Sequence, residues 1–319
     1  MSRVLITGAT GFTGVHLLAY YAARGWEVHG THRSPIVDHS WIPSHAVLHR
    51  VDLLDPPVIT DLMSRVRPTV IHHLAAQSSG AVATHDSWRT LETNARTQYN
   101  VLEAILAVET DTRIVVAGSS DEYGQTPPDC NPIDERAPLL PTTAYAVSKV
   151  IQDVMAYQYF AGHHLQIVRT RPFLQLGPRR SDRFVAGAFA RQVAEIVLGR
   201  REAVIWVGNI DLQRDFTDVR DVAEAYGLLA EQGKAGDVYN IASGIARSLR
   251  EMLTTMLEVA GVQAEIRVDA GRCRPGEAPL LVGDPAKLHA TTGWTPSIIF
   301  QQSVTDTLAF WLDHLRASE

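Results

Sequence analysis

The chain contains few cysteines, and their scarcity excludes two classes of protein. Only Cys130 and Cys273 occur among 319 residues, in unrelated parts of the chain. Such a pair provides neither a disulfide framework nor a thiolate metal site. The 13 histidines include the pairs His72-His73 and His163-His164, and neither pair has ligand spacing with a carboxylate, so we expect no bound metal.

Long apolar runs and runs of like charge are also missing. No apolar stretch approaches the roughly 18 residues of a membrane span, and the opening residues lack the apolar segment of a signal peptide. The net charge is −6, without a run of five like charges, which argues against nucleic acid or an anionic membrane as a partner. We therefore expect a cytoplasmic protein, and local arginines leave anionic small molecules open as ligands.

What is present is an alternation of short apolar runs with helical patterns. The hydrophobic content of 45% over 319 residues can fill a large α/β domain and a smaller one. Strands are predicted at residues 4–6, 27–30, 47–51, 69–72, 113–117 and 166–170. Helices are predicted between them at 14–24, 58–66, 88–108 and 144–161. This order predicts a doubly wound parallel Rossmann sheet with ligand sites at the carboxyl ends of its strands.

The regular alternation weakens after residue 171. Helices are predicted near residues 185–198, 219–231, 249–260 and 301–315. Strands are predicted at 203–207, 238–241 and 265–268. The pattern indicates a smaller α/β unit in the second half of the chain.

A glycine-rich turn follows the first predicted strand. Gly8, Gly11 and Gly14 surround Phe12 and Thr13, and an amphipathic helix begins there. Glycines allow positive φ and bring the backbone close enough for its amides and the helix N-terminus to hold a pyrophosphate. The arrangement of strand, turn and helix predicts dinucleotide binding.

A tyrosine and a lysine stand four residues apart on one predicted helix face. These are Tyr145 and Lys149. An ammonium near a phenol stabilises the phenolate, so we expect Lys149 to lower the pKa of Tyr145 toward the working pH. The pair thus predicts an acid–base device.

With the glycine turn and this pair in place, the chain resembles the extended short-chain dehydrogenase/reductases. The resemblance adds Ser119, in the loop after the strand 113–117, as the third member of a Ser-Tyr-Lys active site. It also implies that Asp52 and Leu53 contact the adenine, and that Leu74, Ala75 and Ala76 line the dinucleotide path.

The residue after the second predicted strand bears on the choice of cofactor. Arg33 stands where NAD enzymes of this type place a carboxylate for the ribose 2′-hydroxyl. A guanidinium pairs well with a 2′-phosphate. We therefore expect NADP(H), with NAD(H) as the alternative.

The second half of the chain resembles the branch of GDP-mannose 4,6-dehydratases and GDP-4-keto-6-deoxy-mannose reductases. The matching segments are residues 207–210, 214–219, 274–277, 281–285 and 293–296. The resemblance implies that the sugar nucleotide is bound by Ser119, Asp121, Glu122, Gln175, Phe184, Val185, Asn209, Arg214, Arg274 and Glu277. It also implies a cofactor domain of residues 1–171 plus about 208–242, and a discontinuous substrate domain of about 172–207 plus 243–319.

Two departures from the branch leave the nucleotide and the sugar open. Leu174 and Gln175 follow Phe173 where relatives generally carry an asparagine. Gly187 stands where some dehydratases have an arginine.

Three functions follow from these patterns. The leading prediction is reduction of the C4 ketone of an NDP-4-keto-6-deoxy hexose, with GDP as the expected nucleotide. The second is a 4,6-dehydratase or epimerase with retained cofactor, in which Asp121 or Glu122 assists elimination. The third, a non-catalytic dinucleotide-binding regulator, is disfavoured because Tyr145 and Lys149 are both present.

The resemblance further implies a homodimer. Relatives pair through two helices, which correspond here to residues 88–108 and 144–161. The apolar residues expected at that contact are Leu91, Val101, Leu102, Val150, Val154, Tyr157 and Tyr159.

Overall fold

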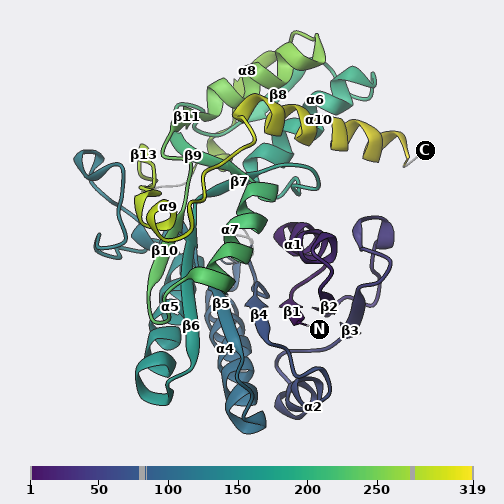
Figure 1. The fold of residues 1–319 in the computed structure, drawn as a ribbon. Helices are drawn as coiled ribbons and strands as arrows, with labels where there is room; N and C mark the ends of the chain where they lie inside the picture. The colour runs from purple at the N-terminus through teal and green to yellow at the C-terminus, as the bar shows by residue number, and fades with distance from the viewer. Residues whose placement is uncertain (1, 79–82, 84, 274–276, 318–319) are drawn as a thin grey trace.

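A seven-stranded parallel sheet organises the first part of the protein. We describe a computed structural model, which covers residues 2–78, 83, 85–273 and 277–317 (Figure 1). The strand order is β10-β6-β5-β4-β1-β2-β3. The strands are β1 (Arg3–Thr7), β2 (Glu27–His32), β3 (Val47–Arg50), β4 (Val70–His73), β5 (Arg113–Ala117), β6 (Gln166–Pro172) and β10 (Val238–Ile241). The predicted doubly wound Rossmann sheet is confirmed.

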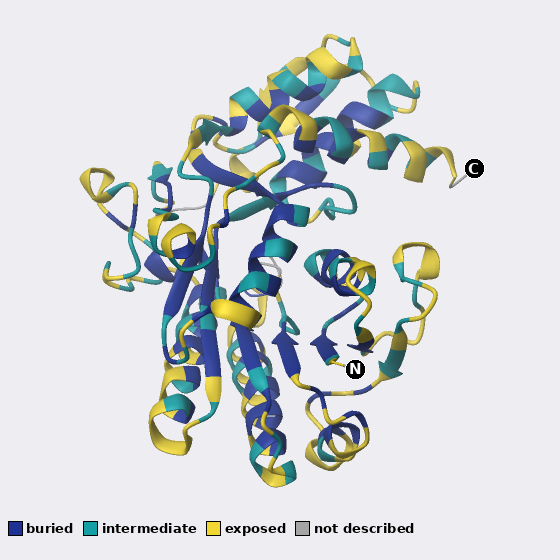
Figure 2. Ribbon diagram, in the orientation of Figure 1, coloured by how far each residue is buried: buried dark blue, intermediate teal, exposed yellow. Residues whose placement is uncertain are grey.

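Helices cover both faces of this sheet. One face carries α1 (Phe12–Ala23), α7 (Val219–Gln232) and α9 (Ala286–Thr292), and the other carries α2 (Pro56–Val66), α4 (Ser87–Val108) and α5 (Ala144–His163). Successive side chains of a strand point to opposite faces. Val4 and Ile6 of β1 accordingly pack on the α1 side, whereas Leu5 packs on the α2 side. Helices on both faces bury the central strands β1, β4 and β5 along most of their length (Figure 2).

A smaller α/β layer lies beyond the carboxyl ends of the large sheet, at the top of Figure 1. Its main sheet joins β7 (Leu174–Leu176), β9 (Gln213–Asp218), β11 (Ala246–Ser248) and β13 (Leu280–Leu281), and a separate pair joins β8 (Val204–Val207) to β12 (Glu265–Val268). The helices are α6 (Val185–Val197), α8 (Leu249–Ala260) and α10 (Phe300–Arg316). They share a core that includes Phe189, Met252 and Trp311.

The division of the chain into two domains stays a prediction. One strand bears directly on it: β9 lies within residues 208–242, which the sequence assigns to the cofactor domain, but it pairs with β7, β11 and β13 of the smaller sheet. The next elements, α7 and β10, belong to the large sheet and its cover. The chain therefore crosses between the layers at the end of β9.

The strand order reverses between β1 and β4, and ligands of such sheets bind at the carboxyl ends of the strands near this point. The glycine turn follows β1, and the loop with Ser119 follows β5.

Among the described residues, no helix is long and apolar enough to span a bilayer.

Candidate functional site

The glycine turn between β1 and α1 brings backbone atoms into close contact. Gly8 has φ +68 and accepts a hydrogen bond at its carbonyl from the amide of Gly11, at 3.0 Å. A Cβ on Gly14 would lie 2.5 Å from that same carbonyl oxygen, and a Cβ on Gly8 would lie 3.0 Å from the backbone of Ala75. No side chain caps α1 at Gly11. The turn therefore fits a pyrophosphate held by backbone amides at the helix N-terminus.

The remaining predicted cofactor residues lie at the same end of the sheet. The Thr7 hydroxyl accepts from the amide of Ala75 at 3.2 Å, which joins the loops after β1 and β4. The other members of that segment, Leu74 and Ala76, are half-buried. After β3, Leu53 is buried and Asp52 is exposed, and Arg33 is exposed after β2.

Tyr145, Lys149 and Ser119 come together from α5 and the turn after β5. Thr143 caps α5 by accepting from the amide of Ala146 at 3.1 Å, which places Tyr145 in the first helical turn. Ser119 hydrogen-bonds the phenol of Tyr145 through its side chain. The Lys149 ammonium lies 6.0 Å from the centre of the tyrosine ring.

The expected lowering of the tyrosine pKa is wrong. Burial raises the pKa of Tyr145 above its usual value, the negative charge of Asp121 raises it further, and the Ser119 hydrogen bond opposes both. Burial lowers the pKa of Lys149 to about 8, opposed by the charge of Glu122. Desolvation is the largest effect on the pKa of both groups, and the Lys149 ammonium donates to the carbonyl of Ala117 at 2.7 Å.

Charged residues from separate elements are linked electrostatically through Asp121, whose charge acts on Tyr145. Asp121 is exposed, and its charge acts on both Tyr145 and Arg214. Burial lowers the pKa of Arg214, whereas the charges of Glu277 and Asp121 raise it. Three of the predicted substrate residues, Asp121, Arg214 and Glu277, thus form one electrostatic group.

Two predicted substrate residues are engaged elsewhere. Glu122 is fully buried, and its carboxylate accepts from the Arg171 guanidinium at 2.9 Å and from the amide of Ser119 at 2.8 Å. A carboxylate with both oxygens occupied in the interior cannot contact a sugar or assist elimination, so this expectation is wrong. Gln175 accepts from the Thr13 hydroxyl at 2.8 Å, which places it against the glycine-turn helix.

The last predicted residues are more dispersed. Phe184 precedes α6 and is half-buried, and Val185 packs against the core of the smaller layer. Asn209 is exposed, and its side chain accepts from the amide of Asp211 at 3.2 Å. Arg274 lies outside the described residues.

The structure adds Arg180, which the sequence did not single out. Its guanidinium lies 3.9 Å from the centre of the Phe184 ring and 4.8 Å from that of Phe12. Burial lowers its pKa to about 10, the charge of Tyr145 opposes this, and its Nε is buried without a partner. A cation between two rings beside Tyr145 fits an anionic ligand. The only sequence signal was the density of arginine in this loop.

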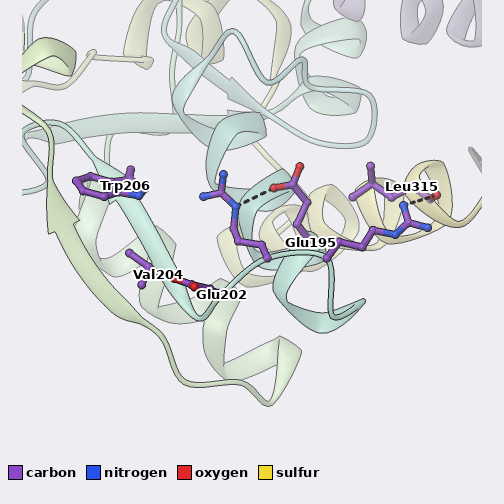
Figure 3. Close-up of a pocket in the computed structure, with 7 residues that line it drawn as sticks. Glu195, Glu202, Val204, Trp206 and Leu315 are labelled. Atoms are coloured by element: carbon purple, nitrogen blue, oxygen red, sulfur yellow. Dashed lines mark hydrogen bonds and ion pairs between the residues drawn. The ribbon is translucent and has the colours of Figure 1, made fainter.

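Two cavities lie away from these residues. One of about 500 Å³ is lined by Glu195, Arg200, Arg201, Glu202, Val204, Trp206 and Leu315. Glu195 accepts from Arg201 at 2.9 Å and Arg200 donates to the backbone carbonyl of Leu315 at 2.9 Å, and Figure 3 draws these interactions as dashed lines. The other, of about 350 Å³, is lined by Asp134, Glu135, Arg136, Asp284 and Lys287. No predicted site residue lines either cavity, and the part of the chain that the structure describes holds no cluster of three metal-ligating side chains.

Comparison with known proteins identifies the fold and the family. A solved Pseudomonas aeruginosa structure, described as RMD complexed with NADPH, matches with a TM-score of 0.87 and 34% identity over 98% of this chain and 100% of that one. A Thermus thermophilus UDP-glucose 4-epimerase in complex with NAD matches with a TM-score of 0.87 and 29% identity over 97% of this chain and 98% of that one. The fold is that of the extended short-chain dehydrogenase/reductases.

Sequence relatives narrow the assignment within the extended short-chain dehydrogenase/reductases. The GDP-6-deoxy-D-mannose reductase of Pseudomonas aeruginosa is 36% identical over 98% of both chains, and a GDP-mannose 4,6-dehydratase of Vibrio cholerae is 29% identical over 94% of this chain and 91% of its own. The model of the GDP-mannose 4,6 dehydratase family matches residues 5–307. The chain belongs to this family.

Proposed function

We propose that the protein reduces the C4 ketone of a GDP-4-keto-6-deoxy hexose with NADPH. The observation that carries the proposal is the convergence of Ser119, Tyr145 and Lys149 beside the glycine turn, with a tyrosine whose raised pKa keeps it protonated. A protonated phenol is what a ketone reductase needs as its acid. The relative named GDP-6-deoxy-D-mannose reductase and the NADPH complex among the structural matches support the same activity.

The proposed roles follow from charge development at one oxygen. Bound NADPH supplies a hydride to the ketone carbon. Tyr145 gives its proton to the carbonyl oxygen as that oxygen becomes an alkoxide, and Ser119 donates a hydrogen bond to the same oxygen. Lys149, at the adjacent turn of α5, holds the nicotinamide ribose.

We assign the cofactor to the edge formed by the loops after β1, β2, β3 and β4. Close backbone packing at Gly8 and Gly14 and the absence of a side-chain cap on α1 support a pyrophosphate there. Exposed Arg33 is proposed to pair with the 2′-phosphate, which makes NADP(H) the expected cofactor.

The second candidate function is a 4,6-dehydratase. Asp121 favours it, because this exposed carboxylate acts on Tyr145 and could remove a proton from the sugar. Glu122 no longer supports it, since its carboxylate is held by Arg171. Several relatives carry the dehydratase name.

Cofactor use distinguishes the two functions. Purified protein with NADPH and GDP-4-keto-6-deoxy-mannose should oxidise one NADPH per product, read by absorbance of the nicotinamide, and GDP-mannose alone should give no product. Formation of a 4-keto sugar from GDP-mannose without net consumption of cofactor would establish the dehydratase instead.

We also propose a cytoplasmic homodimer that pairs through α4 and α5. Val154 and Tyr157 of α5 are about half exposed, at 56% and 50%, and Trp88 of α4 is 73% exposed. Val101, Leu102 and Tyr159, which the sequence assigned to this contact, are instead buried in the core between these helices and the sheet. Light scattering at micromolar concentration tests the dimer, and Val154→Glu should dissociate it.

A further inference from the structure

A buried ion-pair chain joins the loop of Ser119 to the helix that carries Tyr145 and Lys149. Arg171, near the end of β6, donates through Nε to Glu122 at 2.9 Å and through Nη2 to Asp153 at 2.8 Å. The side chains of Arg171, Glu122 and Asp153 are 5%, 0% and 6% exposed. Asp153 lies four residues after Lys149 on α5.

The other oxygen of Glu122 binds the backbone of Ser119. It accepts from the Ser119 amide at 2.8 Å, while the Ser119 hydroxyl accepts from the amide of Asp121 at 3.1 Å, so the two side chains cap the turn η2 (Ser120–Tyr123) reciprocally. Gly118 leaves room for this carboxylate, because a Cβ there would lie 2.4 Å from the Glu122 oxygen.

A second anchor holds the same arginine. Arg171 also donates through Nη1 to the hydroxyl of Tyr123 at 3.1 Å, and that hydroxyl donates to Asn240 of β10 at 2.7 Å. The side chains of this network, Arg171, Glu122, Asp153, Tyr123 and Asn240, are all buried and hydrogen-bonded. A fully satisfied buried polar network fixes the geometry of its residues as well as adding stability.

We propose that Glu122 is a positioning residue, which holds the Ser119 hydroxyl in register with the Tyr145 phenol by tying the turn after β5 through Arg171 to Asp153 of α5. The inference rests on the proposed reductase function, because it assigns to Ser119 a role at the reacting oxygen. It replaces contact with the substrate, the role that the sequence suggested for Glu122. A donor displaced by a fraction of an ångström loses much of its effect on a transition state.

A double-mutant cycle tests the proposal. Glu122→Met keeps the side-chain length but removes both acceptors. We expect its kcat to fall about 10-fold or more, within the range of coupling between contacting residues, with an unchanged KM for NADPH. Ser119→Ala keeps the backbone amide and removes only the hydroxyl. If Glu122 acts through that hydroxyl, the double variant should have the kcat of Ser119→Ala alone.

Arg169→Met provides the matched control. Arg169 pairs with the other oxygen of Asp153 at 3.1 Å and touches neither Glu122 nor Ser119 in the described structure. Its loss removes a buried ion pair and should lower the melting temperature without lowering kcat. Thermal melting and NADPH fluorescence titration confirm that each variant is folded. If Glu122→Met does not accumulate, Glu122→Gln, which retains one acceptor oxygen, replaces it in the same cycle.

The outcomes are separable from those of the proposed function. Wild-type protein that does not oxidise NADPH with the keto sugar would refute the reductase. The positioning role alone would be overturned by two results in an active wild-type background. One is a double variant whose loss of kcat is the product of the two single losses, and the other is a Glu122 variant with unchanged kcat.

Discussion

The Arg180 guanidinium lies over the ring of Phe184, with its carbon 3.9 Å from the ring centre, and both residues belong to the segment before α6. The buried Nε of Arg180 has no partner among the described residues. A cation in this state is costly until an anion pairs with it.

Arg180→Met should therefore separate binding from stability. We expect the affinity for NADPH, for GDP, or for both to fall by about 10-fold or more, as for a lost charge-assisted hydrogen bond. The melting temperature should hold or rise, because a cation with a buried, unpartnered Nε is removed. Arg183→Met, at an exposed position of the same loop, is the control. Unchanged affinity for both ligands would remove Arg180 from the site.

Tyr145→Phe removes the proposed proton donor and leaves α5 and Lys149 in place. Turnover should fall about 100-fold or more, the usual scale for a general acid, with little change in NADPH affinity. The raised pKa of Tyr145 keeps the phenol protonated through neutral pH. Steady-state kinetics at pH 7 checks this, and near wild-type turnover contradicts the assignment.

Arg33→Ala tests the choice of cofactor. The affinity for NADPH should fall far more than that for NADH, because only NADPH carries the 2′-phosphate that a guanidinium can pair with. Fluorescence titration with both nucleotides measures the difference. Equal losses would show that Arg33 does not recognise that phosphate.

His72 should make the fold sensitive to acid. Burial lowers its pKa from 6.5 to about 3. Below pH 6.5 the unfolded chain binds a proton at this position that the folded protein does not, so stability falls as the pH drops from 6.5 toward 3. One such proton contributes a slope of about 1.4 kcal/mol per pH unit.

His72→Leu should flatten the dependence of the unfolding free energy on pH between 6.5 and 4 by about that slope. It should also destabilise the protein at neutral pH, since the Tyr21 hydroxyl loses its partner at 2.7 Å. Urea denaturation at several pH values measures both effects. Exposed His163→Gln is the control, and an unchanged slope in His72→Leu would contradict the linkage.

The large sheet could be read from the sequence because its determinants are local. The apolar strand and glycine turn at residues 3–14, and the four-residue spacing of Tyr145 and Lys149, depend on short-range φ/ψ and helix geometry. The predicted strand 113–117 and the predicted helix 249–260 match β5 and α8 residue for residue. In the smaller layer, β7, β9, β11 and β13 were not predicted, and neither was α9, which covers the large sheet. The sequence Gln-Arg-Asp-Phe-Thr-Asp of β9 reads as polar, and it becomes a buried strand only through three partners distant in the chain.

The sequence by itself therefore determined the fold class, the family and the residue types of the Ser-Tyr-Lys set. Tertiary structure decided which charges face which groups. The Glu122 carboxylate is buried because Arg171 and the Ser119 amide donate to it in the interior. Arg180 lies close enough to Tyr145 to interact with it electrostatically, although its loop has no distinctive sequence pattern. It also decided the sign of the tyrosine pKa shift, because desolvation depends on the atoms that surround a group in space, and sequence spacing records only the neighbours along one helix.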